Sequence, residues 1–132
     1  MSENKGKLKV NVSPAAVSPG ENALAPLVDI YEAADGATVL VAEVPGAGPD
    51  KVDVRVDKGV LTIRADGSLP EVPEGFSRLY VGFAGGEYFR AFALSDEVDR
   101  DKIEATLGGG LLTLRLPRAA AAQSRKIEIK TA

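Results

Sequence analysis

The amino-acid sequence predicts an all-β protein, an antiparallel β-sandwich with flexible tails at both ends. Apolar and polar residues alternate over many short segments between residues 27 and 117. Glycine- and proline-containing pairs separate these segments, as expected for tight turns. No segment in this region shows the longer apolar period of a helix of any length. The chain has 132 residues, 45% of them hydrophobic, which is sufficient for one domain.

The first half of the domain contains four predicted strands, at residues 27–32, 38–44, 52–57 and 60–64. The segment 38–44 is short, apolar and rich in β-branched residues, which favours a buried strand that ends at Pro45. In the segment 52–57, valines alternate with charged residues, so one face is apolar. Because the pair Lys58-Gly59 reverses the chain before the next apolar segment, these two strands should form a hairpin.

The second half begins with a long irregular loop, residues 65–87, which contains a short strand-like piece at 76–83. A loop of this length in a compact domain is usually functional, or is an arm that packs elsewhere. Three further strands are predicted at 88–94, 103–107 and 111–116. Ser95 should cap a turn or a single helical turn, and Pro117 should end the last strand.

The chain divides into a short polar amino-terminal region at 1–26, a domain at 27–117 and a carboxy-terminal extension at 118–132. The alternating segment 8–12 is the one part of the first region that could pair as a strand. The net charge of −3 and the acidic middle region give no basis for binding a phosphate backbone, so no nucleic acid is expected. No apolar run long enough for a membrane span and no signal peptide are visible, so a cytoplasmic location is expected.

The composition argues against catalysis. There is no cysteine and no histidine, which removes thiol nucleophiles, histidine-dependent triads and the commonest metal ligands. The glycines 108–110 lack the Lys-Ser/Thr pair of a phosphate-binding loop. The acidic residues at 96–101 lack the spacing of a calcium loop. We therefore expect no catalytic residue, no cofactor and no metal site.

Apolar surface is the remaining candidate for function. Two rows of apolar residues, each on a strand with a polar opposite face, should point into the sandwich: Val52, Val54 and Val56, and Ile103, Ala105 and Leu107. Ile127 and Ile129 stand apart in a polar tail and would share one side of an extended segment. Such a segment could add to an exposed sheet edge of another chain. A last strand of the same chain, or a tail without a role, are the alternatives.

Several motifs follow one another in order: PLVDIYE at 26–32, AEVPG at 42–46, a hairpin at 52–64, YFRAFAL at 88–94, ATLGGGLLTLRLP at 105–117 and IEI at 127–129. This order resembles the small heat-shock proteins, which are built on the α-crystallin domain, an immunoglobulin-like antiparallel β-sandwich. The resemblance covers about residues 26–130, and it is the combination of motifs in sequence that makes it specific.

The resemblance implies an ATP-independent holding chaperone that binds partly unfolded client proteins, with itself as a further partner. An arm from the long loop would cross to the partner's first strand and make a dimer. The residues implied at that interface are Val28, Ile30, Phe76, Leu79, Val81, Phe83 and Arg90. Ile127 and Ile129 would dock in a groove of a neighbouring subunit, lined by Val52, Val54, Val56, Ile103, Ala105 and Leu107.

Two features depart from the family pattern. The region 1–26 is short and polar, whereas in the family this region is often longer and apolar and drives large assemblies. The arm is also richer in glycine than a crossing strand requires. The main alternative is a non-enzymatic interaction module like the related co-chaperones, which share the sandwich but lack both the arm and the isoleucine motif.

Overall fold

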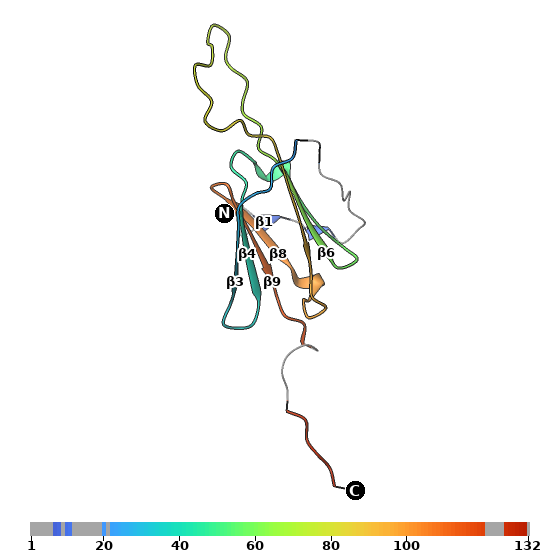
Figure 1. The fold of residues 1–132 in the computed structure, drawn as a ribbon. Helices are drawn as coiled ribbons and strands as arrows, with labels where there is room; N and C mark the ends of the chain where they lie inside the picture. Colours follow the sequence, from blue (N-terminus) through green and yellow to red (C-terminus); the bar gives the residue numbers. More distant parts are fainter. Residues whose placement is uncertain (1–6, 9, 12–19, 21, 121–125, 132) are drawn as a thin grey trace.

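The computed structural model describes residues 7–8, 10–11, 20, 22–120 and 126–131. Two β-sheets pack face to face (Figure 1), which confirms the all-β sandwich. The strands are β1 (Lys7–Leu8), β2 (Val10–Asn11), β3 (Val28–Glu32), β4 (Thr38–Glu43), β5 (Val52–Asp57), β6 (Val60–Asp66), β7 (Glu87–Ala93), β8 (Glu104–Gly108) and β9 (Leu111–Leu116). Among the described residues, the helical elements are two short 3₁₀ turns, η1 (Pro49–Lys51) and η2 (Arg100–Lys102).

One sheet has the strand order β1-β8-β9-β4-β3, and the other has the order β2-β5-β6-β7. All pairs of neighbouring strands are antiparallel except β2 with β5. The predicted hairpin is confirmed as β5–β6, in which Asp57 lies opposite Val60. Its turn residues Lys58 and Gly59 have φ angles of 48° and 78°. Positive φ at both positions is the geometry that matches the right-handed twist of the two strands.

The core lies between the sheets and is built almost entirely from aliphatic side chains. Leu61, Ile63, Leu112 and Leu114 are fully buried. The two predicted apolar rows point inward, because Val54, Val56 and Ala105 are buried and their neighbours pack against the core. Strand alternation therefore places the polar side chains of β5 and β8 on the outside of the sandwich. The two apolar rows lie on the inner faces of these strands, at one edge of the sandwich.

One local prediction differs from the structure. The strand-like piece expected at 76–83 is wrong: residues 67–86 contain no strand. A strand needs a neighbour for its backbone groups, and this segment projects away from both sheets (Figure 1). The prediction for Ser95 is confirmed in its first form: Ser95 caps a turn, and its hydroxyl accepts from the amide of Glu97. The helical turn η2 follows later and is capped by the side chain of Asp99.

Candidate assembly surfaces

Among the described residues, β7 and β3 are edge strands of the two sheets, and their outer sides are covered to different extents. At the β7 edge, Leu24 forms a parallel bridge to Tyr88: its amide donates to the carbonyl of Glu87 (2.7 Å) and its carbonyl accepts from Phe89 (2.9 Å). At the opposite end of the five-stranded sheet, β3 pairs only with β4 within the described part of the chain. The outer edge of β3 therefore presents backbone groups that a further strand could pair with.

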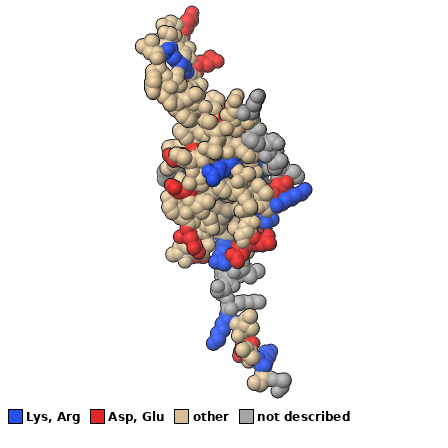
Figure 2. Space-filling model, in the orientation of Figure 1, with Lys and Arg blue, Asp and Glu red and all other residues tan. Residues whose placement is uncertain are grey.

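The long loop predicted from the sequence forms an arm, defined here as residues 67–86, that extends beyond the sandwich (Figure 1). Its apolar side chains are exposed: 72% for Phe76, 96% for Leu79 and 88% for Tyr80. Val81 and Phe83 are about half exposed. The arm surface is mostly uncharged, and its few charged side chains gather near the free end (Figure 2). Such a concentration of exposed large apolar side chains marks an interaction surface.

Three of the arm's five glycines, Gly67, Gly85 and Gly86, lie at its base, where two backbone segments approach each other closely. The amide of Gly67 donates to the carbonyl of Gly86 at 2.8 Å. Gly85 has a φ of 70°, and a Cβ there would lie 2.4 Å from the carbonyl oxygen of Gly67. A larger residue would be strained and would clash with backbone. The high glycine content noted in the sequence thus has a structural reason, at least at this pair of positions.

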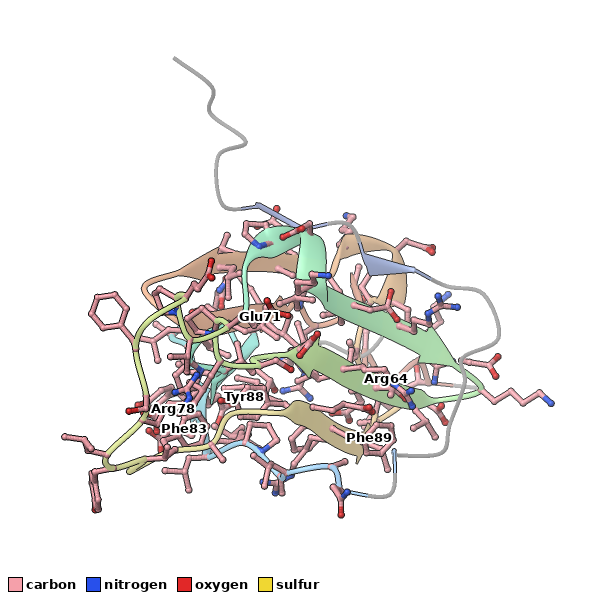
Figure 3. The ribbon with its side chains drawn as sticks, turned by 90° about the horizontal axis from the view of Figure 1, so that it is seen from above. Arg64, Glu71, Arg78, Phe83, Tyr88 and Phe89 are labelled. Atoms are coloured by element: carbon pink, nitrogen blue, oxygen red, sulfur yellow. The ribbon has the colours of Figure 1, made fainter. Side chains whose placement is uncertain are left out.

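Tyr88 links the arm to both sheets. Its ring stacks on Phe83 with a centroid distance of 6.4 Å (Figure 3), and its hydroxyl donates to the carbonyl of Pro45 at 2.8 Å. A small apolar cavity of about 250 Å³ lies beside this pair, and Leu24, Pro26 and Leu27 also line it. The base of the arm and the segment that leads into β3 therefore form one continuous surface.

Replacing Tyr88 with phenylalanine should reduce the free energy of unfolding by about 1 kcal/mol, the usual contribution of one hydrogen bond. Burial raises the pKa of the Tyr88 phenol, so folding favours its neutral form. The stabilisation that the neutral Tyr88 phenol contributes is present below the ordinary tyrosine pKa of about 10. It is lost as pH rises through the pKa that Tyr88 has in the folded protein. Urea unfolding at fixed protein concentration, near neutral pH and above pH about 10, should show a smaller difference between the two proteins at high pH. An equal difference at both pH values would contradict this.

The predicted interface residues on β3 and β7 have different surroundings. Ile30 is 57% exposed, whereas Val28 packs against the core of its own chain. Arg90 is half-buried; its guanidinium donates to the carbonyl of Pro26 at 3.3 Å and lies 5.1 Å from the centre of the Phe92 ring. Within one chain, Arg90 thus holds the start of the β3 segment against β7. Its role at an interface stays a prediction.

The edge expected to receive the tail is formed by β5 and β8, and in this chain both strands already have a neighbour there. Leu8 of β1 pairs opposite Ala105, and Val10 of β2 pairs opposite Val54. The alternation at 8–12 predicts a strand in this region. It does not predict that two short strands, β1 and β2, pair with different sheets. Ile127 and Ile129 are 80% and 90% exposed, and residues 126–131 form no secondary structure.

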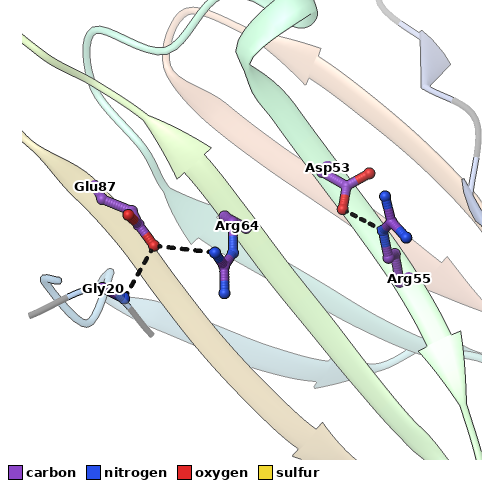
Figure 4. A network of polar contacts seen from close by, with 5 residues as sticks. All are labelled: Gly20, Asp53, Arg55, Arg64 and Glu87. Atoms are coloured by element: carbon purple, nitrogen blue, oxygen red, sulfur yellow. Dashed lines mark hydrogen bonds and ion pairs between the residues drawn. The ribbon is translucent and has the colours of Figure 1, made fainter. Parts of the chain in front are cut away.

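The charged residues singled out in the sequence are used in local contacts. Glu97 pairs with Arg118 (3.0 Å), Asp96 with Arg100 (3.6 Å), and Asp99 caps η2. On the outer face of the four-stranded sheet, Glu87 contacts Arg64 and the amide of Gly20, and Asp53 contacts Arg55 (Figure 4). Exposed pairs of this kind contribute little to stability. In the described part of the chain, no three acidic residues gather in a way that could hold a metal ion.

The fold and these edges define a β-sandwich of the α-crystallin type. Residues 30–130 match the Hsp20/alpha crystallin family, and the chain belongs to it. A probable 15 kDa heat shock protein of Leptospira interrogans is 36% identical over 108 residues, which cover 82% of this chain and 80% of that protein. The 18 kDa antigen 2 of Mycobacterium avium is 35% identical over 91 residues, and the chain spans 64% of its length.

Solved structures show the same architecture. Heat shock protein 16.0 from Schizosaccharomyces pombe has a TM-score of 0.65 and 33% identity, covering 81% of this chain and 99% of that chain. A small heat-shock protein from Xylella fastidiosa, whose crystal structure shows a distinct high-order structure, has a TM-score of 0.64 and 35% identity over 82% of this chain. Members of this family are chaperones without enzymatic activity, in agreement with the expectation from composition. None of the described helices is long and apolar enough to cross a membrane.

Proposed function

We propose that this protein is an ATP-independent holding chaperone that binds partly unfolded proteins and prevents their aggregation. It assembles through strand-exchanged dimers and through docking of its carboxy-terminal tail. The observation that supports this best is the combination of an open β3 edge with an apolar arm that exposes Phe76, Leu79 and Tyr80. An exposed edge and an exposed apolar segment each stabilise the other once two copies meet.

In the dimer, the arm of one subunit lies along β3 of its partner and extends the five-stranded sheet. Backbone hydrogen bonds to β3 fix the position of the arm, and Ile30 and Tyr31, both more than half exposed, offer side-chain contacts. Each large apolar side chain that becomes fully buried contributes roughly 1.5–3 kcal/mol. Phe76, Leu79 and Tyr80 are therefore the main candidates for the binding energy.

Larger assemblies would form through a second contact between exposed apolar side chains and a strand edge. The extended tail with Ile127 and Ile129 is exposed and offers two apolar side chains two residues apart. It would dock at the β5–β8 edge of a neighbouring subunit. Both kinds of docking are reversible contacts through apolar surface. When they open, the freed surface can bind an unfolding client, because burial of apolar area stabilises either contact and no nucleotide is needed.

Light scattering of a heat-labile client protein, at rising temperature and without ATP, tests this function. We expect scattering to be suppressed when the protein is present at a near-equal molar ratio of subunits to client. The protein's own mass and folded state are measured in parallel. Unchanged scattering with a folded protein of known mass would contradict the holdase function, and a monomeric mass would then favour the co-chaperone-like interaction module.

A further inference from the structure

The amino-terminal strands β1 and β2 pair with different sheets. In the described residues, β1 pairs antiparallel with β8 of one sheet, and β2 pairs parallel with β5 of the other. A single residue, position 9, separates the two short strands. Residues 8 and 10 of an extended chain are at most about 7 Å apart. The edges of β8 and β5 therefore come close enough on this side of the sandwich for one short segment to pair with both.

The register shows where this segment lies. Leu8 is opposite Ala105, and Val10 is opposite Val54. Both partner residues are members of the apolar rows proposed to receive the tail, and both are 1% exposed. The backbone groups that β5 and β8 would offer to a docking tail are thus the same groups that pair with β2 and β1.

The two ends of the chain also carry the same short pattern. Residues 8–10 read Leu-Lys-Val and residues 127–129 read Ile-Glu-Ile, each with one charged residue between two aliphatic ones. Both segments therefore match an edge that takes two apolar residues two positions apart. One of them is paired at this edge, and the other is exposed and without secondary structure.

We propose that β1 and β2 are intramolecular occupants of the β5–β8 edge and compete there with the carboxy-terminal tail of another subunit. This inference rests on the proposed docking of the tail. A segment in the same chain has a high effective concentration, so it covers the edge in the isolated subunit. Assembly through the tail then requires the amino-terminal segment to leave the edge. The apparent affinity of the edge for the tail is the intrinsic affinity multiplied by the fraction of subunits in which the edge is free.

The first experiment measures binding of a labelled peptide of residues 124–132 to the full-length protein by fluorescence anisotropy. The test variant is Leu8→Pro/Val10→Pro, because proline is disfavoured in paired strands and removes a backbone donor. The matched control is Leu8→Val/Val10→Ile, which keeps strand-forming residues. All proteins carry Ile127→Ala/Ile129→Ala, so that their own tails do not occupy the edge. We expect the proline variant to bind the peptide at least about fivefold more tightly than the control.

The outcomes separate the two proposals. Equal affinity for the proline variant and the control overturns the competition but leaves tail docking in place. Absence of binding to either protein overturns both. Circular dichroism and hydrogen exchange of the buried β6 amides show whether the proline variant is folded.

A second measurement does not depend on the tail. In the Ile127→Ala/Ile129→Ala background, hydrogen exchange at the outward amides of β5 and β8 should be slower in the control than in the proline variant. This protection should not change with protein concentration, because the segment belongs to the same chain. Fast exchange in the control, or protection that increases with concentration, would overturn the proposal; the second result would place the segment of another copy at this edge.

Discussion

Replacing Leu79 and Tyr80 with aspartate is expected to convert the proposed dimer into a folded monomer. These side chains are 96% and 88% exposed in the single chain, so their replacement removes almost no intramolecular contact. In the proposed dimer they are buried against β3 of the partner, where a carboxylate would lose its hydration without gaining a partner. Two such central substitutions should raise the dissociation constant by at least about 100-fold. Sedimentation velocity over a range of protein concentrations measures this shift.

The control for this prediction is Leu79→Ile/Tyr80→Phe, which keeps the apolar area of the arm. It should remain a dimer with nearly unchanged affinity. Circular dichroism and the thermal midpoint of each monomeric form show that the sandwich itself is intact. If the aspartate variant keeps the wild-type mass, the arm does not make the dimer, and another surface must be sought.

The sandwich could be predicted from the sequence because its signals are local. The alternation in 52–57 and the Lys58-Gly59 turn define a hairpin within a few residues, and the structure contains it as β5–β6 with that turn. The strand at 38–44 could be predicted in the same way, because a short apolar, β-branched segment that ends at Pro45 is typical of a buried strand. Both patterns depend only on neighbours in sequence.

The candidate assembly surfaces could be predicted only in part. The apolar content of 76–83 indicates an interaction segment, but in the single chain this segment has no neighbouring strand to pair with, so the expected strand is absent. The pairing of β1 and β2 with the two sheets depends on the closeness of β5 and β8, which are separated by about a third of the sequence. The parallel bridge from Leu24 to Tyr88 has no periodic signal in the sequence at all. Long-range edge contacts of this kind depend on how the sheets pack in the completed fold, so a local sequence pattern does not predict them.

Replacing Ile127 and Ile129 with alanine is expected to reduce any larger assembly to dimers without unfolding the domain. The two side chains are 80% and 90% exposed, so the free energy of unfolding of the single chain should not change measurably. Each docked isoleucine that is truncated loses several methylene groups of buried area, at about 0.8 kcal/mol each, and a ring or cage of subunits contains several such contacts. Mass measured by light scattering after size exclusion should therefore fall to that of a dimer.

The matched control is Lys126→Gln/Glu128→Gln, which changes two residues of the same tail and leaves the net charge unchanged. It should keep the wild-type mass, because the proposed docking depends on the two isoleucines. The two largest predicted effects are also distinguishable from each other: the tail variant retains the arm and should stop at the dimer, whereas the arm variant loses the dimer itself. A tail variant with unchanged mass would mean that Ile127 and Ile129 hold no subunits together, and the exposed arm would then carry all of the assembly.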